Sequence, residues 1–317
     1  MGGALHPAVA ATRLAVRTTL AGVTGDVVVA VSGGADSLAL AAAVAFEAPG
    51  RGVVLTVDHG LQPRSAERAV AVLGQLAAEG YRDRRAVRVQ VNAAAGGAGP
   101  EAAARTARYA ALDAPGLPVL LGHTLDDQAE TVLLALGRGS GPSALAGMRS
   151  GGSRLRPFLG LRRAVTRAAC EAQGLEPWDD PHNDDPRFRR VRVRHELLPL
   201  AEDVLSGGVA EALARTATQV GADVDLLEAL AAEALTDDVV ALTALPGALR
   251  RRVLKRLAED AGTAALTSVH VNALERLVTD WHGQGVIDLP GGFGARRVSG
   301  RLQVMPSRSP DEAVIPE

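Results

Sequence analysis

One stretch near the N-terminus constrains the fold more than any other, because it joins a buried strand directly to a helix. Residues 27–31 are an uninterrupted apolar run, which predicts a fully buried parallel strand. A Ser-Gly-Gly turn follows at 32–34, and the alanine-rich residues 36–47 then have helical spacing. Such a turn brings backbone N–H groups and the positive end of a helix to one point, so the stretch predicts an anion-binding site.

The side chains of this turn extend the prediction to a nucleotide. Two hydroxyl groups can donate hydrogen bonds, and Asp36 offers a carboxylate where a phosphate-bound Mg²⁺ would need one. The turn is no Walker loop, which needs a lysine, because the one lysine of the chain is the distant Lys255. An ordinary strand–turn–helix corner is the plainer alternative. The complete string resembles the PP-loop of the ATP pyrophosphatases, which implies that ATP is bound by Ser32, Gly33, Gly34, Ala35, Asp36 and Ser37.

Composition restricts the class of protein. The 317 residues carry a formal net charge of −2, so an RNA-binding site would have to be a local basic patch. Cys170 is the only cysteine, which excludes a disulfide framework and predicts a reducing compartment. Residues 1–22 have arginines within their apolar stretch and predict a helix, not a signal peptide. With no apolar run of membrane-spanning length, we expect a cytoplasmic protein with no membrane partner.

Strands and helices alternate over the first half of the chain. Strands are expected at 52–60, 85–91 and 118–122, helices at 64–79, 101–112 and 126–136, and a glycine-rich loop at 95–100. The alternation predicts an α/β fold with a parallel, Rossmann-like sheet, whose ligands bind at the carboxyl ends of the strands. Three polar clusters fall there, at 32–37, 58–59 and 123–130. Their convergence on one edge predicts an enzyme.

The third cluster places His123 before a helix with acids at its start. Asp127 and Glu130 are three residues apart, so both carboxylates share one helix face. Acids near a helix N-terminus also satisfy the helix dipole without any chemistry. The functional alternative is that the cluster binds a cationic amine, a metal, or a base about to react.

Further stretches resemble the tRNA(Ile)-lysidine synthetase family. They follow the family's order through residues 25–200, and a weaker resemblance covers 245–305. They are 57–61, 101–105 with 108–109, 122–134 with 138–141, 156–157, 178–183, 190–194 and 197–199. Three positions depart from the family pattern: Val191, His182 and Gln62 stand where Asn, Ser and Arg are usual.

The resemblance implies a PP-loop domain of the adenine nucleotide alpha hydrolase type and a specific reaction. ATP adenylates the wobble cytidine of a CAU-anticodon isoleucine tRNA, and L-lysine then displaces AMP at C2, after pyrophosphate has left. Asp36 would hold Mg²⁺ beside the phosphates. The implied catalytic residues are Asp36, His123, Asp127 and Glu130, with substrate or tRNA contacts from Arg105, Arg108, Arg190, Arg192 and Arg194.

The second half of the chain predicts a division into domains. We expect a catalytic domain at 1–205, a helical linker at 206–235, a small, mostly helical tRNA-binding domain at 236–305 and a disordered tail at 306–317. Elements are expected at 161–173, 249–256 and 268–281 as helices, and at 285–304 as a hairpin.

Two segments leave alternatives open. Five arginines in residues 187–194 suit tRNA phosphates, with steep salt dependence, or a solvated helix face. The glycine- and serine-rich residues 137–152 suit a mobile loop over the site or a plain connector. For the whole chain, a monomer and a homodimer both stay open. The rival functions are another PP-loop enzyme, such as a tRNA thiolase or an amidating synthetase, and an inactive nucleotide- or RNA-binding module.

Overall fold

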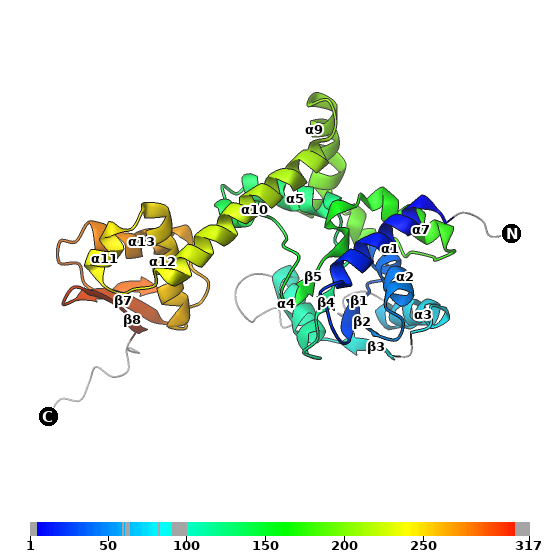
Figure 1. Ribbon diagram of the computed structural model, residues 1–317, viewed down its shortest axis with the longest axis horizontal. Helices are drawn as coiled ribbons and strands as arrows, with labels where there is room; N and C mark the ends of the chain where they lie inside the picture. Colours follow the sequence, from blue (N-terminus) through cyan, green and yellow to red (C-terminus); the bar gives the residue numbers. More distant parts are fainter. Residues whose placement is uncertain (1–4, 59, 61–63, 82, 91–99, 308–317) are drawn as a thin grey trace. The chain divides into compact units, whose positions relative to one another are not determined.

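The chain folds into two compact units. The computed structural model describes residues 5–58, 60, 64–81, 83–90 and 100–307. The units are Met1–Gly221 and Ala222–Glu317, and the division falls within helix α10 (Val209–Glu233), which covers most of the linker expected at 206–235 (Figure 1). The predicted residues His59, Gln62, 95–99 and 308–317 lie outside the described part of the chain.

The first unit is built on a parallel sheet, as predicted. Among the described residues its five strands run in the order β3-β2-β1-β4-β5. They are β1 (Val27–Ala30), β2 (Gly52–Asp58), β3 (Asp83–Arg88), β4 (Val119–Leu120) and β5 (Arg154–Leu155). The strand order reverses between β1 and β4, and ligands of such sheets bind at this reversal, outside the carboxyl ends of the strands. Strand β5 has only two residues and was not predicted.

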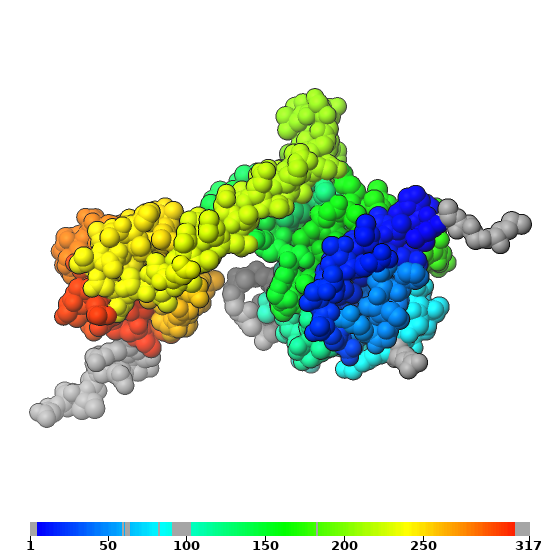
Figure 2. All heavy atoms as spheres, viewed as in Figure 1, coloured from blue at the N-terminus to red at the C-terminus, as the bar shows by residue number. Residues whose placement is uncertain are grey.

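Helices cover both faces of the sheet. Alternate residues of β1 explain its unbroken apolar run: Val27 and Val29 belong to one core, and Val28 and Ala30 to the other. The first core contains side chains of α1 (Pro7–Leu20), α2 (Ala35–Glu47), α3 (Ser65–Ala78) and α7 (Arg163–Ala172), and the second contains side chains of α4 (Pro100–Asp113). In the space-filling view the dark blue atoms of α1 lie directly against those of α2 and α7 (Figure 2).

The segments after β4 are helical over much of their length. They are α5 (Leu125–Leu136), α6 (Pro142–Leu145), α8 (Arg189–Arg192), a π-helix (Val193–Leu197), α9 (Leu198–Val204) and the 3₁₀ turns Pro157–Gly160 and Pro181–Asp184. The segment 137–152 contains α6 and is tied back to α5. The amide group of Gln128 accepts from the backbone N–H of Met148 at 2.8 Å and donates to its carbonyl at 3.2 Å.

The second unit combines helices with an antiparallel sheet. Its further helices are α11 (Val239–Ala244), α12 (Gly247–Asp260) and α13 (Ser268–Thr279). Its strands β6 (Ile287–Leu289), β7 (Phe293–Val298) and β8 (Arg301–Pro306) pair in that order, with the predicted turn between β6 and β7. The sheet contributes Leu289, Ala295 and Leu302 to one core with the helices. Within the described residues, none of the helices has the length and hydropathy to cross a bilayer.

A close backbone contact fixes the end of β4 against the start of α2. At Gly122, a Cβ atom would lie 2.8 Å from the carbonyl oxygen of Asp36 and 3.2 Å from the backbone nitrogen of Ser37. Real Cβ atoms do not approach backbone atoms so closely, so only glycine fits. The contact therefore joins the two sequence motifs, 32–37 and 123–130, at the edge of the sheet.

We predict that Gly122→Ala separates these motifs. The added Cβ meets backbone atoms, which cannot rotate away, so the free energy of unfolding should fall by about 1–3 kcal/mol, as for other overpacked sites. Urea unfolding measures the change. Gly22→Ala is the control, since its Cβ would have no neighbour within 4 Å, and equal stability of the two variants would contradict the prediction.

Candidate functional site: an arginine–carboxylate cluster beside a phosphate loop

The turn after β1 has the geometry of an anion-binding loop. Gly33 has a φ of +92°, a conformation that glycine adopts without strain, and Gly34 is the N-cap of α2. The hydroxyl of Ser37 donates to the carbonyl of Gly34 at 2.8 Å and accepts from the backbone N–H of Ser32 at 3.2 Å. These bonds hold the turn closed around the helix start, where the positive end of the helix dipole lies.

The acids at the start of α5 have structural partners. Asp127 closes a capping box: its Oδ2 accepts from the backbone N–H of Thr124 at 2.8 Å and from the Thr124 hydroxyl at 2.9 Å. Asp126 reaches the start of α7, where its Oδ2 accepts from the backbone N–H of Arg163 at 2.7 Å. Both acids therefore bind backbone N–H groups at helix N-termini, Asp127 at α5 and Asp126 at α7. A purely structural role, without any chemistry, thus accounts for part of what they do.

Arg163 lies between three carboxylates from two helices. Its Nη2 donates to Oδ1 of Asp127 at 2.7 Å, its Nη1 lies 3.4 Å from Oε1 of Glu130, and its Nε lies 3.5 Å from Oδ2 of Asp36. Asp36 also accepts from the hydroxyl of Thr166, one turn along α7. One guanidinium therefore links the acid of the phosphate loop to both acids of α5.

Glu130 is completely buried and holds two more arginines. Arg194 donates from Nε to Oε1 at 2.7 Å and from Nη2 to Oε2 at 3.2 Å, which is a bidentate pair. The Nε of Arg190 lies 3.1 Å from Oε2, and its Nη2 donates to the hydroxyl of Thr131 at 2.7 Å. Arg163, Arg190 and Arg194 thus surround a single carboxylate.

The pKa values of two acids shift in opposite directions. At Asp36, burial raises the pKa above its ordinary value, and the bond from Thr166 and the charge of Arg163 oppose this only in part. At Asp127, burial also favours the neutral acid, but the charge of Arg163 and the hydrogen bonds from Thr124 together lower the pKa. Asp127 is therefore a stable carboxylate, whereas the charge of Asp36 is compensated incompletely.

His123 follows β4 and faces basic neighbours. Its Nδ1 accepts a hydrogen bond from Nε of Arg156 at 3.3 Å. Burial, together with the charges of Arg156, Arg108 and Arg190, lowers the pKa of the imidazole to about 4, against the opposing charge of Asp127. The ring is therefore neutral at physiological pH.

A polar cavity of about 610 Å³ brings most of the predicted site residues together. Its walls include Ser32, Gly34, Ala35, Asp36, Ser37, Arg105, Arg108, His123, Asp127, Arg190 and Arg194. The buried Glu130 is not part of its lining. Arg192 lies elsewhere on the surface, paired with Glu196 at 2.7 Å, and its predicted role in tRNA binding stays a prediction.

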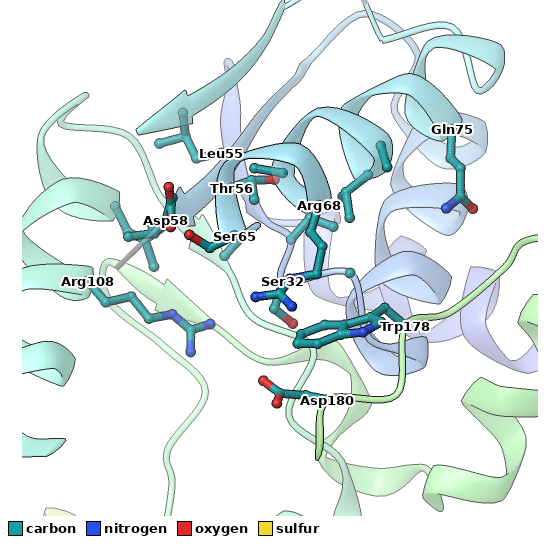
Figure 3. A pocket seen from close by; sticks show the side chains of 18 of the residues that line it. Ser32, Leu55, Thr56, Asp58, Ser65, Arg68, Gln75, Arg108, Trp178 and Asp180 are labelled. Atoms are coloured by element: carbon teal, nitrogen blue, oxygen red, sulfur yellow. The ribbon is translucent and has the colours of Figure 1, made fainter. Parts of the chain in front are cut away.

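A second, more apolar cavity of about 480 Å³ adjoins the first. It lies beyond the ends of β1 and β2 and includes Gly33, Leu55, Val57 and Val72 in its walls. At its edge the guanidinium of Arg68 stacks on the indole ring of Trp178, 4.3 Å from the ring centroid (Figure 3). Both cavities share lining residues, namely Ala30, Ser32, Arg108, Trp178 and Asp180.

Arg108 projects into the region that both cavities share. Figure 3 shows its side chain reaching from α4 toward the cavity. Among the described residues it forms neither a hydrogen bond nor an ion pair with a carboxylate, and burial lowers the pKa of its guanidinium. An uncompensated guanidinium in a cavity favours an anionic ligand. The phosphate or carboxylate contact expected for Arg105 and Arg108 stays a prediction.

The sequence analysis assigned no role to several residues of this site. They are Arg163 and Thr166, together with Arg156 and Trp178, which it named only within stretches that resemble the family. One local signal was present for Arg163: it is the first residue of α7, where a positive charge opposes the helix dipole and needs compensation from elsewhere.

We predict that Glu130→Gln destabilises the first unit strongly. Removing the carboxylate leaves Arg163, Arg190 and Arg194 close together around a neutral group, so the free energy of unfolding should fall by about 3 kcal/mol or more. Urea unfolding is the measurement. Glu196→Gln, which breaks a surface pair with Arg192, is the matched control and should leave the unfolding midpoint unchanged. A Glu130→Gln variant as stable as this control would refute the structural importance of the cluster.

Comparison with known proteins places this site in a family. Residues 12–201 match the model of a PP-loop domain, and residues 238–303 match that of the TilS substrate binding domain. A tRNA(Ile)-lysidine synthase of Thermobifida fusca is 50% identical over 94% of this chain and 98% of its own, and one of Leifsonia xyli is 51% identical over 84% and 85%.

Among solved structures, the U34-tRNA thiolase NcsA of Methanococcus maripaludis, with its [4Fe-4S] cluster, has a TM-score of 0.54 at 16% identity. The match covers 67% of this chain and 79% of the thiolase, and it shows the fold alone. The sequence matches carry the assignment, because they extend over both units. The chain belongs to the tRNA(Ile)-lysidine synthase family.

Proposed function

We propose that this protein uses ATP to attach L-lysine to C2 of the wobble cytidine in a CAU-anticodon isoleucine tRNA. The proposed steps are adenylation of the cytidine with release of pyrophosphate, followed by displacement of AMP by the ε-amine of lysine. The names of relatives that are about half identical over nearly the whole chain support this reaction. The structural observation that supports it best is the pair of adjoining cavities that meet at Ser32 and Arg108.

The two cavities suit the two ends of ATP. The more apolar one suits an adenosine, and the polar one, lined by Arg105, Arg108 and the start of α2, suits the phosphates. The two meet beside the phosphate loop, where the α-phosphate would lie. Preorganised N–H and guanidinium donors at this point would stabilise the charge that develops when the cytidine O2 attacks.

Asp36 fits the role of a Mg²⁺ ligand. Mg²⁺ in nucleotide sites is held by one or two carboxylates together with phosphate oxygens and water, so a single acid suffices. The pKa of Asp36 is raised because burial disfavours its charged form more than Thr166 and Arg163 favour it. A bound cation would supply the missing positive charge. Bound there, Mg²⁺ would neutralise phosphate charge.

We assign the two acids of α5 different parts in lysine transfer. Asp127 lines the polar cavity and carries a carboxylate with a lowered pKa, so it suits the lysine ammonium or the cytidine. Glu130 has no exposed surface and is held by three arginines, so it acts through Arg163, Arg190 and Arg194. These arginines would in turn position the phosphates.

The rival functions lack comparable support. Cys170 is buried, its Sγ contacts the carbonyl of Ala35 at 3.2 Å, and burial raises the pKa of its thiol to about 11. Such a thiol forms little thiolate at neutral pH, which argues against sulfur transfer by this residue. An inactive binding module is not favoured either, because the matched relatives are named as synthases.

Lysine incorporation tests the proposed function directly. The purified protein is incubated with ATP, Mg²⁺, labelled lysine and an isoleucine tRNA transcript with the CAU anticodon. Label should enter the tRNA with one AMP and one pyrophosphate per lysine, and a transcript with uridine in place of the wobble cytidine should accept none, because it lacks the reacting base. Equal labelling of both transcripts, or pyrophosphate release that requires a sulfur donor or glutamine instead, would overturn the proposal.

Asp36→Asn tests the metal site. The amide keeps the volume and a hydrogen-bond acceptor for Thr166 but loses the charge that would hold Mg²⁺. We expect pyrophosphate release to fall by about 10²-fold or more at every Mg²⁺ concentration. Asp26→Asn, which removes an exposed acid just before β1, is the control and should keep full activity. A fully active Asp36→Asn variant would refute a metal at this position.

A further inference from the structure

We propose that Arg156 is a positioning residue that fixes His123 as the neutral tautomer with its proton on Nε2, so that this nitrogen donates a hydrogen bond to an anionic oxygen of the substrate. The inference deepens the proposed function and rests on it for the identity of the substrate. The tautomer itself follows from the contacts of the imidazole ring.

The direction of the hydrogen bond between the two side chains is fixed by chemistry. A guanidinium can only donate, so the contact from Nε of Arg156 to Nδ1 of His123, 3.3 Å long, requires a lone pair on Nδ1. A neutral imidazole with an unprotonated Nδ1 carries its proton on Nε2. Protonation of Nδ1 would place two N–H groups against each other, so the same contact also opposes the charged form.

Arg156 is itself held in place by its neighbours. Its backbone N–H donates to the hydroxyl of Ser150 at 2.8 Å, and its Nη1 donates to the carbonyl of Arg149. The side chain does not belong to the lining of either cavity. Arg156 therefore reaches the site through His123.

The other nitrogen of His123 is available to a ligand. His123 lines the polar cavity, and its Nε2 has no hydrogen-bond partner in the described part of the chain. The charged groups around the ring are Arg108, Arg156, Arg190 and Asp127, of which the three arginines disfavour the imidazolium. An Nε2–H donor beside uncompensated Arg108 faces a region that selects for negative oxygen atoms, such as those of a phosphate.

This arrangement gives His123 a defined task. The ring donates from Nε2 without exchanging a proton, as an electrostatic stabiliser of developing phosphate charge, and does not act as a general acid or base. Its contribution is then independent of pH over the physiological range, because the proton on Nε2 is present throughout. Without Arg156, Nδ1 of His123 no longer has to stay unprotonated to accept a hydrogen bond, and one nearby positive charge is lost.

Nuclear magnetic resonance of the full chain labelled with ¹⁵N-histidine tests the tautomer without any substrate. The protein has seven histidines, and a His123→Gln sample assigns the signal. We expect the Nε2–H tautomer at pH 7 and no protonation above pH 5. An Nδ1–H tautomer, or a midpoint near that of a free histidine, would overturn the inference whether or not the protein makes lysidine.

Two substitutions then separate the hydrogen bond from the charge. Arg156→Met removes both, so we expect a mixture of tautomers and a higher midpoint, whereas Arg156→Gln keeps an N–H donor and should retain the Nε2–H tautomer. Arg154→Met removes a nearby guanidinium that pairs with Asp113 at 2.5 Å, and it should leave the His123 signal unchanged. A wild-type signal in Arg156→Met would overturn the inference.

The pH profile of lysine attachment gives the functional readout. In Arg156→Met the neutral ring is partly the Nδ1–H tautomer, which lacks a proton on Nε2, whereas the imidazolium carries protons on both nitrogens. The kcat of Arg156→Met should therefore be below the wild-type value at pH 8 and recover as pH falls through the His123 midpoint, while the wild-type and Arg154→Met proteins show no such recovery. Identical profiles for Arg156→Met and the wild type would contradict the positioning role, since a purely structural loss would lower activity equally at all pH values.

Discussion

The guanidinium of Arg163 joins the two halves of the site, and the rest of the arrangement depends on it. It pairs with Asp127 at 2.7 Å and lies near Asp36 and Glu130, which belong to different helices. Without this cation the carboxylates of Asp36 and Asp127 would repel each other in a partly buried space. Helix α7 is held in turn, because Asp126 of α5 accepts from its first backbone N–H. Charge balance and helix packing therefore depend on the same few residues.

Some arginines of the site are paired with carboxylates, and others carry a positive charge that no carboxylate of the described residues balances. Carboxylates balance Arg163 and Arg194, which stabilises the shape of the cavity in the absence of ligand. Arg108 has no such balance among the described residues, and the neutral His123 adds no negative charge beside it. Anionic substrates would thus bind where positive charge is unpaired, against a framework that is already fixed. Preorganisation of this kind reduces the cost of arranging dipoles during the reaction.

Local sequence signals predicted most of the framework, and long-range contacts account for what they missed. The apolar run 27–31 and the glycines after it specify β1, the turn and α2, because each depends on adjacent residues. Strand β5 has two residues and exists through its pairing with β4, which no local pattern reveals. Arg163 meets Asp127 across 36 positions of sequence, and Arg156 meets His123 across 33, so only the fold brings them together. The sequence named the acids together with Arg190 and Arg194, but it revealed neither Arg163 nor the ion pairs that hold the acids.

The stacked pair of Arg68 and Trp178 gives the protein an intrinsic optical reporter. Trp178 stands where both cavities meet, and the only other tryptophan of the chain, Trp281, belongs to the second unit. A nucleotide that displaces Arg68 or covers the indole would alter the emission of Trp178 through changed polarity and quenching. With Trp281 replaced by Phe, the remaining signal would come from this one ring, so ligand occupancy could be followed in real time without an attached dye.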